Sequence, residues 1–141
     1  MNRVDVRKQL GYSLAEIMIV IAIMGLMLAI TAPAVSGYLR VSRLAGASNL
    51  LVADIHYART LASEHRSTYE IRFGPTTYSL VRVSPLATIT TRSLQRGVTC
   101  AASDTATFYA WGLTAPVIIT MNNQADAQTI RLSATGGVSR D

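Results

Sequence analysis

An uncharged, mostly apolar run from Ile17 to Leu39 limits what this chain can fold into. In a helix that rises 1.5 Å per residue, about 20 apolar residues cross a hydrocarbon core of roughly 30 Å. The sequence therefore predicts one transmembrane helix. A cleaved secretory signal fits poorly, because its apolar core is usually only about 7 to 15 residues long.

One acidic residue, Glu16, stands at the N-terminal end of this run. A carboxylate without a partner in the membrane costs roughly 2 to 3 kcal/mol or more, which makes such an acid a candidate functional residue. A glutamate at this end of the helix can instead lie among the lipid headgroups, where the helix dipole favours it. Its position alone leaves both interpretations open.

The charges before the apolar run predict the orientation of the chain. Arg3, Arg7 and Lys8 stand against Asp5, so the first eleven residues carry a net charge of +2. A short basic segment ahead of an apolar helix stays in the cytoplasm. We therefore expect the residues beyond about position 36 to lie outside the cytoplasm.

The helical pattern continues after the apolar run. Apolar residues recur at spacings of three and four, which indicates an amphipathic helix that ends near His65 to Ser67. The expected buried face consists of Leu44, Ala47, Leu51, Ile55, Ala58, Leu61 and Ala62. The other faces carry Arg43, Ser48, Asp54, Arg59 and Glu64.

The remaining residues predict strands. Alternating residues and turn signals indicate a hairpin from Tyr69–Phe73 and Tyr78–Val83, followed by strands at Ala87–Leu94, Thr105–Trp111, Val117–Met121 and Thr129–Ser133. Strands that follow one helix predict an α+β fold, in which an antiparallel sheet packs on the apolar face of the helix. The expected organisation is a basic leader at 1–11, an apolar helix at 12–39, an amphipathic helix at 40–67 and a β-rich domain at 68–141.

The N-terminal order of residues resembles the class III signal of type IV pilins and type II secretion pseudopilins. A basic leader precedes Gly11, then Tyr12-Ser13-Leu14, then Glu16 and the apolar helix. The resemblance implies that a prepilin peptidase cuts between Gly11 and Tyr12 and methylates the new amino group of Tyr12. It also implies that Pro33 loosens the helix. Tyr12 replaces the usual Phe, and Ser13 with Ala15 replaces the commoner Thr and Ile or Leu.

The resemblance also implies a partner for Glu16. Cleavage would create an ammonium group at Tyr12, and Glu16 of an entering subunit would meet this group on a neighbour in the filament. Such a pair would set the register more securely than it would add stability, because desolvation offsets much of the attraction. A contact from Glu16 to its own N-terminus, four residues back, is the rival account.

The later part of the chain is similar to the GspH/FimT branch of minor pilins and pseudopilins. The similarity lies in the helical segment from Asp54 to Ala62 and in a C-terminal order of glycines and strands: Trp111-Gly112, Val117 to Thr120, Thr129 to Ser133 and Gly136 to Val138. It implies a structural subunit of a type IV pilus or secretion pseudopilus, held in the inner membrane with its C-terminal domain in the periplasm. The implied partners are other pilins, the prepilin peptidase and an inner-membrane assembly platform.

DNA binding is the alternative function, because some FimT-type minor pilins bind DNA through a C-terminal Gly-Arg-x-Arg type of motif. The chain carries a net charge of +5, and removal of the leader leaves ten arginines against seven acids, or +3. The C-terminal residues keep Arg140 but have Gly137 where the first arginine would stand. Arg92, Arg96 and Arg140 are the candidate contacts, although one tail arginine is too few to hold a phosphate backbone.

We expect no enzymatic activity, no metal and no cofactor. His56 and His65 lie nine residues apart, not at the spacing of a helical metal pair. The single cysteine, Cys100, cannot form an intrachain disulfide and is expected to be buried. Arg59 is expected to bridge the helix and the sheet or to face solvent.

Overall fold

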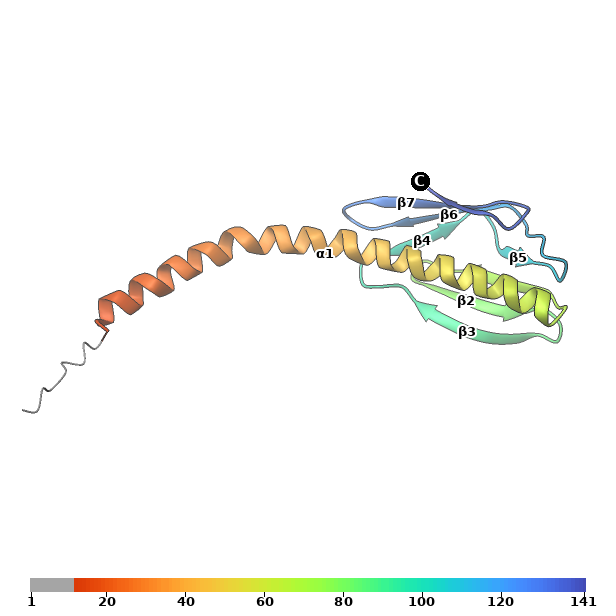
Figure 1. Cartoon of the computed structure of the whole chain (residues 1–141), viewed down its shortest axis with the longest axis horizontal. Helices are drawn as coiled ribbons and strands as arrows, with labels where there is room; N and C mark the ends of the chain where they lie inside the picture. Colours follow the sequence, from red (N-terminus) through yellow and green to blue (C-terminus); the bar gives the residue numbers. More distant parts are fainter. Residues whose placement is uncertain (1–11) are drawn as a thin grey trace, which may run out of the picture. The chain divides into compact units, whose positions relative to one another are not determined.

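The computed structural model describes residues 12–141. The chain forms two compact units, one up to Ser36 and the other from Gly37 to Asp141. A single helix, α1, spans Leu14–Glu64 and contributes to both units (Figure 1). Its end lies within one residue of the predicted C-terminal limit, where His65 N–H still donates to the Leu61 carbonyl.

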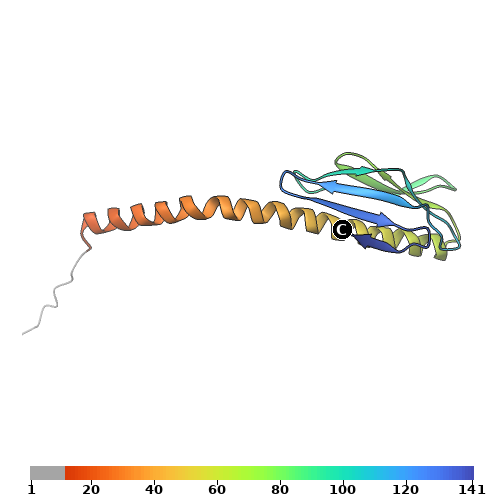
Figure 2. The same cartoon turned by 90° about the horizontal axis from the view of Figure 1, so that it is seen from above.

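The second unit contains eight antiparallel strands in two four-stranded sheets (Figures 1 and 2). The first sheet has the order β3-β2-β1-β5, and the second has the order β4-β6-β7-β8. The strands are β1 (Tyr69–Phe73), β2 (Thr77–Arg82), β3 (Ala87–Ser93), β4 (Thr99–Ala102), β5 (Ala106–Phe108), β6 (Val117–Asn122), β7 (Ala127–Leu132) and β8 (Val138–Arg140). The predicted α+β class with an antiparallel sheet domain is confirmed, with two sheets in place of one.

Both sheets pack on one face of α1. The buried helical residues recur at spacings of three and four: Leu44, Ala47, Ser48, Leu51, Asp54, Ile55, Ala58 and Ala62. They meet apolar side chains of both sheets, including Ile71, Leu80, Ile119 and Ile130, in one core. The expected face was correct except at three positions: Leu61 is only partly buried, while Ser48 and Asp54 are buried.

Turn residues set the register of the hairpins. The β1–β2 pair places Phe73 opposite Tyr78, and Gly74 N–H donates to the Thr77 carbonyl at 2.7 Å. In the β6–β7 turn, the side-chain oxygen of Asn123 accepts from the N–H groups of Ala125 and Asp126. Both turns follow the glycine, proline and asparagine signals in the sequence.

One predicted strand is shorter in the structure, and two observed strands were not predicted. The expected strand from Thr105 to Trp111 shrinks to β5, because the chain turns at Tyr109, whose carbonyl accepts from Gly112 N–H. Strands β4 and β8 were not expected. Both are short, and β4 has the sequence Thr-Cys-Ala-Ala, which lacks the bulky β-branched alternation that indicates a strand.

Candidate functional site

The N-terminal end of α1 places Glu16 in the first helical turn. The helix begins at Leu14, and the N–H of Glu16 donates to the Ser13 carbonyl at 3.0 Å. An acidic side chain in the first turn is favoured by the helix dipole. The first turn of α1 therefore favours the negative charge of Glu16, independently of any partner of the carboxylate.

Tyr12, which precedes the first residue of α1, lies near Glu16. Together with Ile17, Val20 and Ile21 they line a shallow hollow of about 290 Å³. Within residues 12–141, the Glu16 carboxylate has no hydrogen-bond or ion-pair partner. Gly11, the residue expected before the cleavage point, lies outside the described residues.

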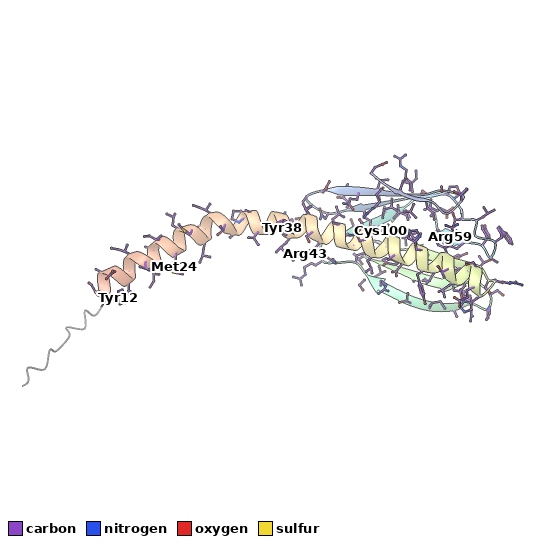
Figure 3. The ribbon with its side chains drawn as sticks, viewed as in Figure 1. Tyr12, Met24, Tyr38, Arg43, Arg59 and Cys100 are labelled. Atoms are coloured by element: carbon purple, nitrogen blue, oxygen red, sulfur yellow. The ribbon has the colours of Figure 1, made fainter. Side chains whose placement is uncertain are left out.

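The apolar part of α1 is uncovered by the rest of the described chain. Its most apolar 18-residue window has a mean hydropathy of 2.5 and is 0% buried, and Tyr12, Met24 and Tyr38 all project from the helix (Figure 3). α1 is the one described helix that is long and apolar enough to cross a membrane. Lipid or other subunits would have to cover this surface.

Pro33 lies inside α1 and does not end it. A proline has no N–H to donate, so the Ala29 carbonyl lacks its usual helical partner. Two nearby hydroxyls bond locally instead: Thr31 donates to the Met27 carbonyl at 2.7 Å, and Ser36 donates to the Pro33 carbonyl at 2.8 Å. The helix contains a weakened point that is compatible with the flexibility expected of Pro33.

The candidate DNA contact Arg92 is held in an ion pair. Its Nε donates to Asp54 Oδ2 at 2.6 Å, and the Tyr78 hydroxyl donates to the same oxygen at 2.6 Å. Asp54 is 5% exposed, whereas the Arg92 side chain is 43% exposed. Burial raises the pKa of the Tyr78 hydroxyl, and the neighbouring carboxylate of Asp54 raises this pKa further. The three side chains link α1 to the β2–β3 edge of the first sheet.

The other two candidate contacts lie apart in the fold. Arg140 is in β8, at the edge of the second sheet, and its guanidinium donates to the side-chain oxygen of Asn49. Arg96 is exposed in the turn between β3 and β4. The C-terminal residues are thus part of a sheet, and Asp141 pairs with Arg131 at 3.2 Å.

The family model described as "Prokaryotic N-terminal methylation motif" matches residues 6–32, which include the Gly11-Tyr12 junction and Glu16. No curated protein matches the chain in sequence. The type IV minor pilin FimU of Pseudomonas aeruginosa has a similar structure, with 18% identity, a TM-score of 0.61 and coverage of 74% of this chain and 92% of FimU. The minor pseudopilin EpsH of the Vibrio cholerae type 2 secretion system matches with 6% identity, a TM-score of 0.58 and coverage of 65% of this chain and 90% of EpsH.

The chain is similar to type IV pilins and pseudopilins in two respects, an N-terminal methylation motif and the fold. The motif lies within residues 6–32. The fold is that of FimU and EpsH over the 74% and 65% of this chain that the two structures cover. The predicted resemblance to GspH/FimT-type minor pilins is thereby confirmed.

Arg59 joins α1 to the β7–β8 turn. Its Nη1 donates to the Gly136 carbonyl at 3.4 Å, and a Cβ at position 136 would lie 2.8 Å from Arg59 Cζ. Gly136 also has a φ of +81°, which favours glycine. Arg59 is therefore a bridge between the helix and the sheet, the first of the two roles expected for it.

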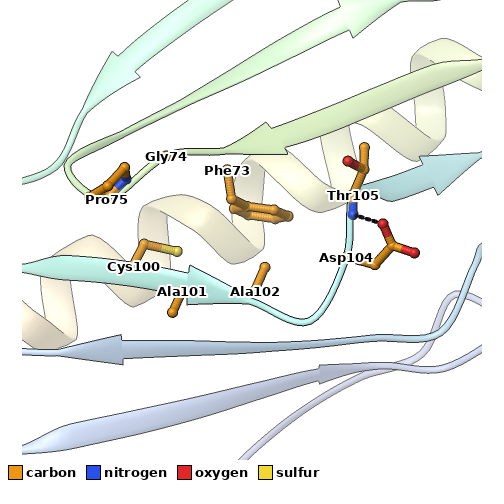
Figure 4. A pocket seen from close by; sticks show the side chains of 8 residues that line it. All are labelled: Phe73, Gly74, Pro75, Cys100, Ala101, Ala102, Asp104 and Thr105. Carbon is orange, nitrogen blue, oxygen red and sulfur yellow. Dashed lines mark hydrogen bonds between the residues drawn. The ribbon is translucent and has the colours of Figure 1, made fainter.

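Cys100 of this pilin-like chain lies on β4, beside a hollow of about 380 Å³ that is also lined by Phe73, Pro75 and Asp104 (Figure 4). The thiol is buried as predicted, and burial raises its pKa to about 11. Pro75 accepts a hydrogen bond from Cys100 N–H at 2.9 Å. Its burial and contacts indicate that Cys100 is a structural residue between the two sheets.

The two histidines do not meet. His56 is exposed on α1, while His65 Nδ1 lies 3.2 Å from the Tyr69 hydroxyl. Across residues 12–141, no group of three or more His, Cys, Asp or Glu side chains could hold a metal ion.

Proposed function

We propose that this chain is a minor pilin or minor pseudopilin: a membrane-anchored structural subunit that joins a type IV pilus or a type II secretion pseudopilus. The methylation motif over residues 6–32 is the observation that carries the proposal. The uncovered apolar segment of α1 and the fold shared with FimU and EpsH support it. On this proposal the chain acts by assembly rather than by catalysis.

The proposed processing follows from the position of the motif. A prepilin peptidase on the cytoplasmic side would hydrolyse the peptide bond between Gly11 and Tyr12, and the Tyr12 amino group would then be methylated. The three basic residues of the leader favour retention of this end in the cytoplasm. The C-terminal domain would consequently lie in the periplasm, and the assembly platform would act on the subunit in the inner membrane.

Glu16 is the proposed assembly residue. Its carboxylate is exposed and unpaired in the described part of the chain, and Glu16 lines the same hollow as Tyr12. Once Tyr12 carries an ammonium group, each subunit has one negative and one positive group that can pair with those of its neighbours. Because an unpaired charge in the membrane is costly, a neighbour placed in the correct register is favoured over other arrangements.

Replacement of Glu16 tests this assembly role. We expect Glu16→Ala and Glu16→Gln subunits to be cleaved normally, but their amount in sheared filaments should fall at least tenfold. A loss of about 1.4 kcal/mol in the free energy of subunit association is enough for a tenfold decrease. The matched control is Glu64→Gln, which removes an exposed acid from the other end of α1. Normal incorporation of both Glu16 variants would show that the carboxylate has no role in assembly.

Capture of DNA is the second hypothesis, carried by Arg92, Arg96 and Arg140. Arg92 and Arg140 belong to edge strands of different sheets and already bond Asp54 and Asn49. Binding through phosphates would weaken steeply with salt. A mobility-shift titration of the full chain in detergent, with no shift even at low salt, would remove this hypothesis.

A further inference from the structure

Three arginines gather around one hollow of the second unit, Gly37 to Asp141, which is called the soluble domain below. Arg40 and Arg43 come from α1, and Arg96 comes from the β3–β4 turn. Gly97, Asn123 and Gln124 complete the lining of this hollow, which has a volume of about 140 Å³. We refer to these three side chains as the arginine cluster.

The surrounding turns are fixed to the helix. Asn123 Nδ2 donates to the Arg40 carbonyl at 2.7 Å, so the β6–β7 turn is attached to α1 at the cluster. The side-chain oxygen of Asn123 orders the same turn through Ala125 and Asp126 N–H. On the other side, Gln95 lies against Gly46, where an added Cβ would be 3.2 Å from Gln95 Nε2. The hollow is therefore a defined feature of the fold.

The cluster carries positive charge without nearby compensation. None of the lining residues is acidic, and no ion pair among residues 12–141 includes Arg40, Arg43 or Arg96. Asp126, two residues after Gln124, accepts a hydrogen bond from Ala127 N–H and lines a different hollow. Three exposed guanidinium groups around a polar hollow suit a phosphate group, which arginine binds through paired hydrogen bonds.

Two arginines of the cluster directly follow the predicted membrane-spanning segment in the sequence. Arg40 is the first charged residue after the run from Ile17 to Leu39, and Arg43 follows within one helical turn. Residues at the end of a membrane-spanning segment lie at the level of the lipid headgroups. Figure 3 shows Arg43 on α1 where the soluble domain begins.

We propose that the arginine cluster binds anionic phospholipid headgroups on the outer face of the membrane that holds α1, and so docks the soluble domain on the bilayer before assembly. The inference rests on the proposed membrane anchoring. Assembly would have to break this contact as the subunit leaves the lipid. Bound lipid would thereby favour the unassembled subunit.

A membrane surface fits the cluster better than DNA does. Chain connectivity keeps Arg40 beside the bilayer, where a duplex would compete with lipid phosphates already present at high local concentration. Each basic residue near an anionic surface favours that surface by roughly fivefold, so three would give roughly a hundredfold preference. Of the candidate DNA contacts, only Arg96 belongs to the cluster.

The test uses the full chain in lipid nanodiscs. A Cys100→Ala, Ala125→Cys variant carries a donor dye in the β6–β7 turn, and a fraction of the lipid headgroups carries the acceptor. Energy transfer then reports docking of the domain, in nanodiscs of phosphatidylcholine alone and in nanodiscs that also contain phosphatidylglycerol. Arg40→Gln/Arg43→Gln/Arg96→Gln is compared with the control Arg66→Gln/Arg72→Gln/Arg82→Gln, which removes the same charge elsewhere on the domain.

We expect phosphatidylglycerol to increase energy transfer, salt to reverse the increase, and the cluster variant to reduce the docking equilibrium constant roughly a hundredfold. The control variant should retain the response. Equal transfer in both lipids would overturn the proposal while leaving assembly untouched. Binding of a labelled oligonucleotide through the same arginines, without a lipid response, would assign the cluster to DNA instead. Failure of the chain to remain in nanodiscs would overturn the anchoring and this inference together.

Discussion

At the scale of single residues, Asp54 shows what periodicity misses. Helical spacing placed it away from the apolar face, because an acid is normally a surface residue. The structure buries it, since Tyr78 from β2 and Arg92 from β3 both donate hydrogen bonds to its carboxylate. Only the pairing of distant strands brings these partners to the helix, so no local pattern could have indicated them.

Removal of the Asp54 carboxylate should destabilise the soluble domain. We expect Asp54→Ala to lower the free energy of unfolding by about 2 to 3 kcal/mol, because the buried Tyr78 hydroxyl loses its acceptor. Urea unfolding of the full chain in detergent, followed by circular dichroism, measures the change. Glu64→Ala should stay within about 0.5 kcal/mol of the parent chain. An equally small effect of Asp54→Ala would show that the contact is not important for stability.

The buried thiol of Cys100 should make the stability of the domain depend on pH in the alkaline range. Burial raises the pKa of its thiol from 9.0 to about 11, so the folded chain holds this proton more tightly than the unfolded chain does. The thiol's contribution to stability is complete below pH 9 and is lost as the pH rises toward 11, by about 2 kcal/mol. Tyr78, whose pKa is also raised, adds a further loss above pH 10.

The same unfolding measurement, made between pH 8 and about 11, separates the two groups. Cys100→Ala should be less stable than the parent chain near pH 8 by about 1 kcal/mol, through the lost packing, and should lose less stability on going to high pH. Parallel pH curves for the two proteins would contradict the assignment of this loss to the thiol.

At the scale of elements, regular patterns were the reliable signals. The amphipathic part of α1, the β1–β2 hairpin and the β6–β7 pair were predicted from periodicity and turn residues, and all three are present. Strands β4 and β8 were missed, because each is short and is defined by its pairing with β6 or β7. Such strands form through tertiary contacts that a local sequence pattern does not encode.

The contact between α1 and the β7–β8 turn can be tested at Gly136. We expect Gly136→Ala to destabilise the domain by more than about 1 kcal/mol, because a Cβ at positive φ is strained and would also overlap the Arg59 guanidinium. Adding Arg59→Ala should relieve the overlap but not the backbone strain. Strictly additive effects of the two substitutions in urea unfolding would contradict the close contact.

At the scale of the whole molecule, the N-terminal motif and the arginine cluster differ in how far the sequence alone predicts them. The methylation motif over residues 6–32 could be recognised in the sequence, because it is local and specific. The arginine cluster could not, since Arg96 joins Arg40 and Arg43 only after β3 and the turn that follows it pack beside α1. An N-terminal methylation motif and a pilin-like fold in one chain are what the proposed filament subunit requires.

The most direct test of the central claim is mass spectrometry of the N-terminus of this chain, recovered from sheared filaments. We predict a mature chain that begins at N-methylated Tyr12 and contains Glu16 and the intact apolar segment. A matched strain without the prepilin peptidase should accumulate the chain with residues 1–11 still attached. Recovery from filaments of a chain that retains its leader, or one cleaved beyond Ser36, would contradict the account.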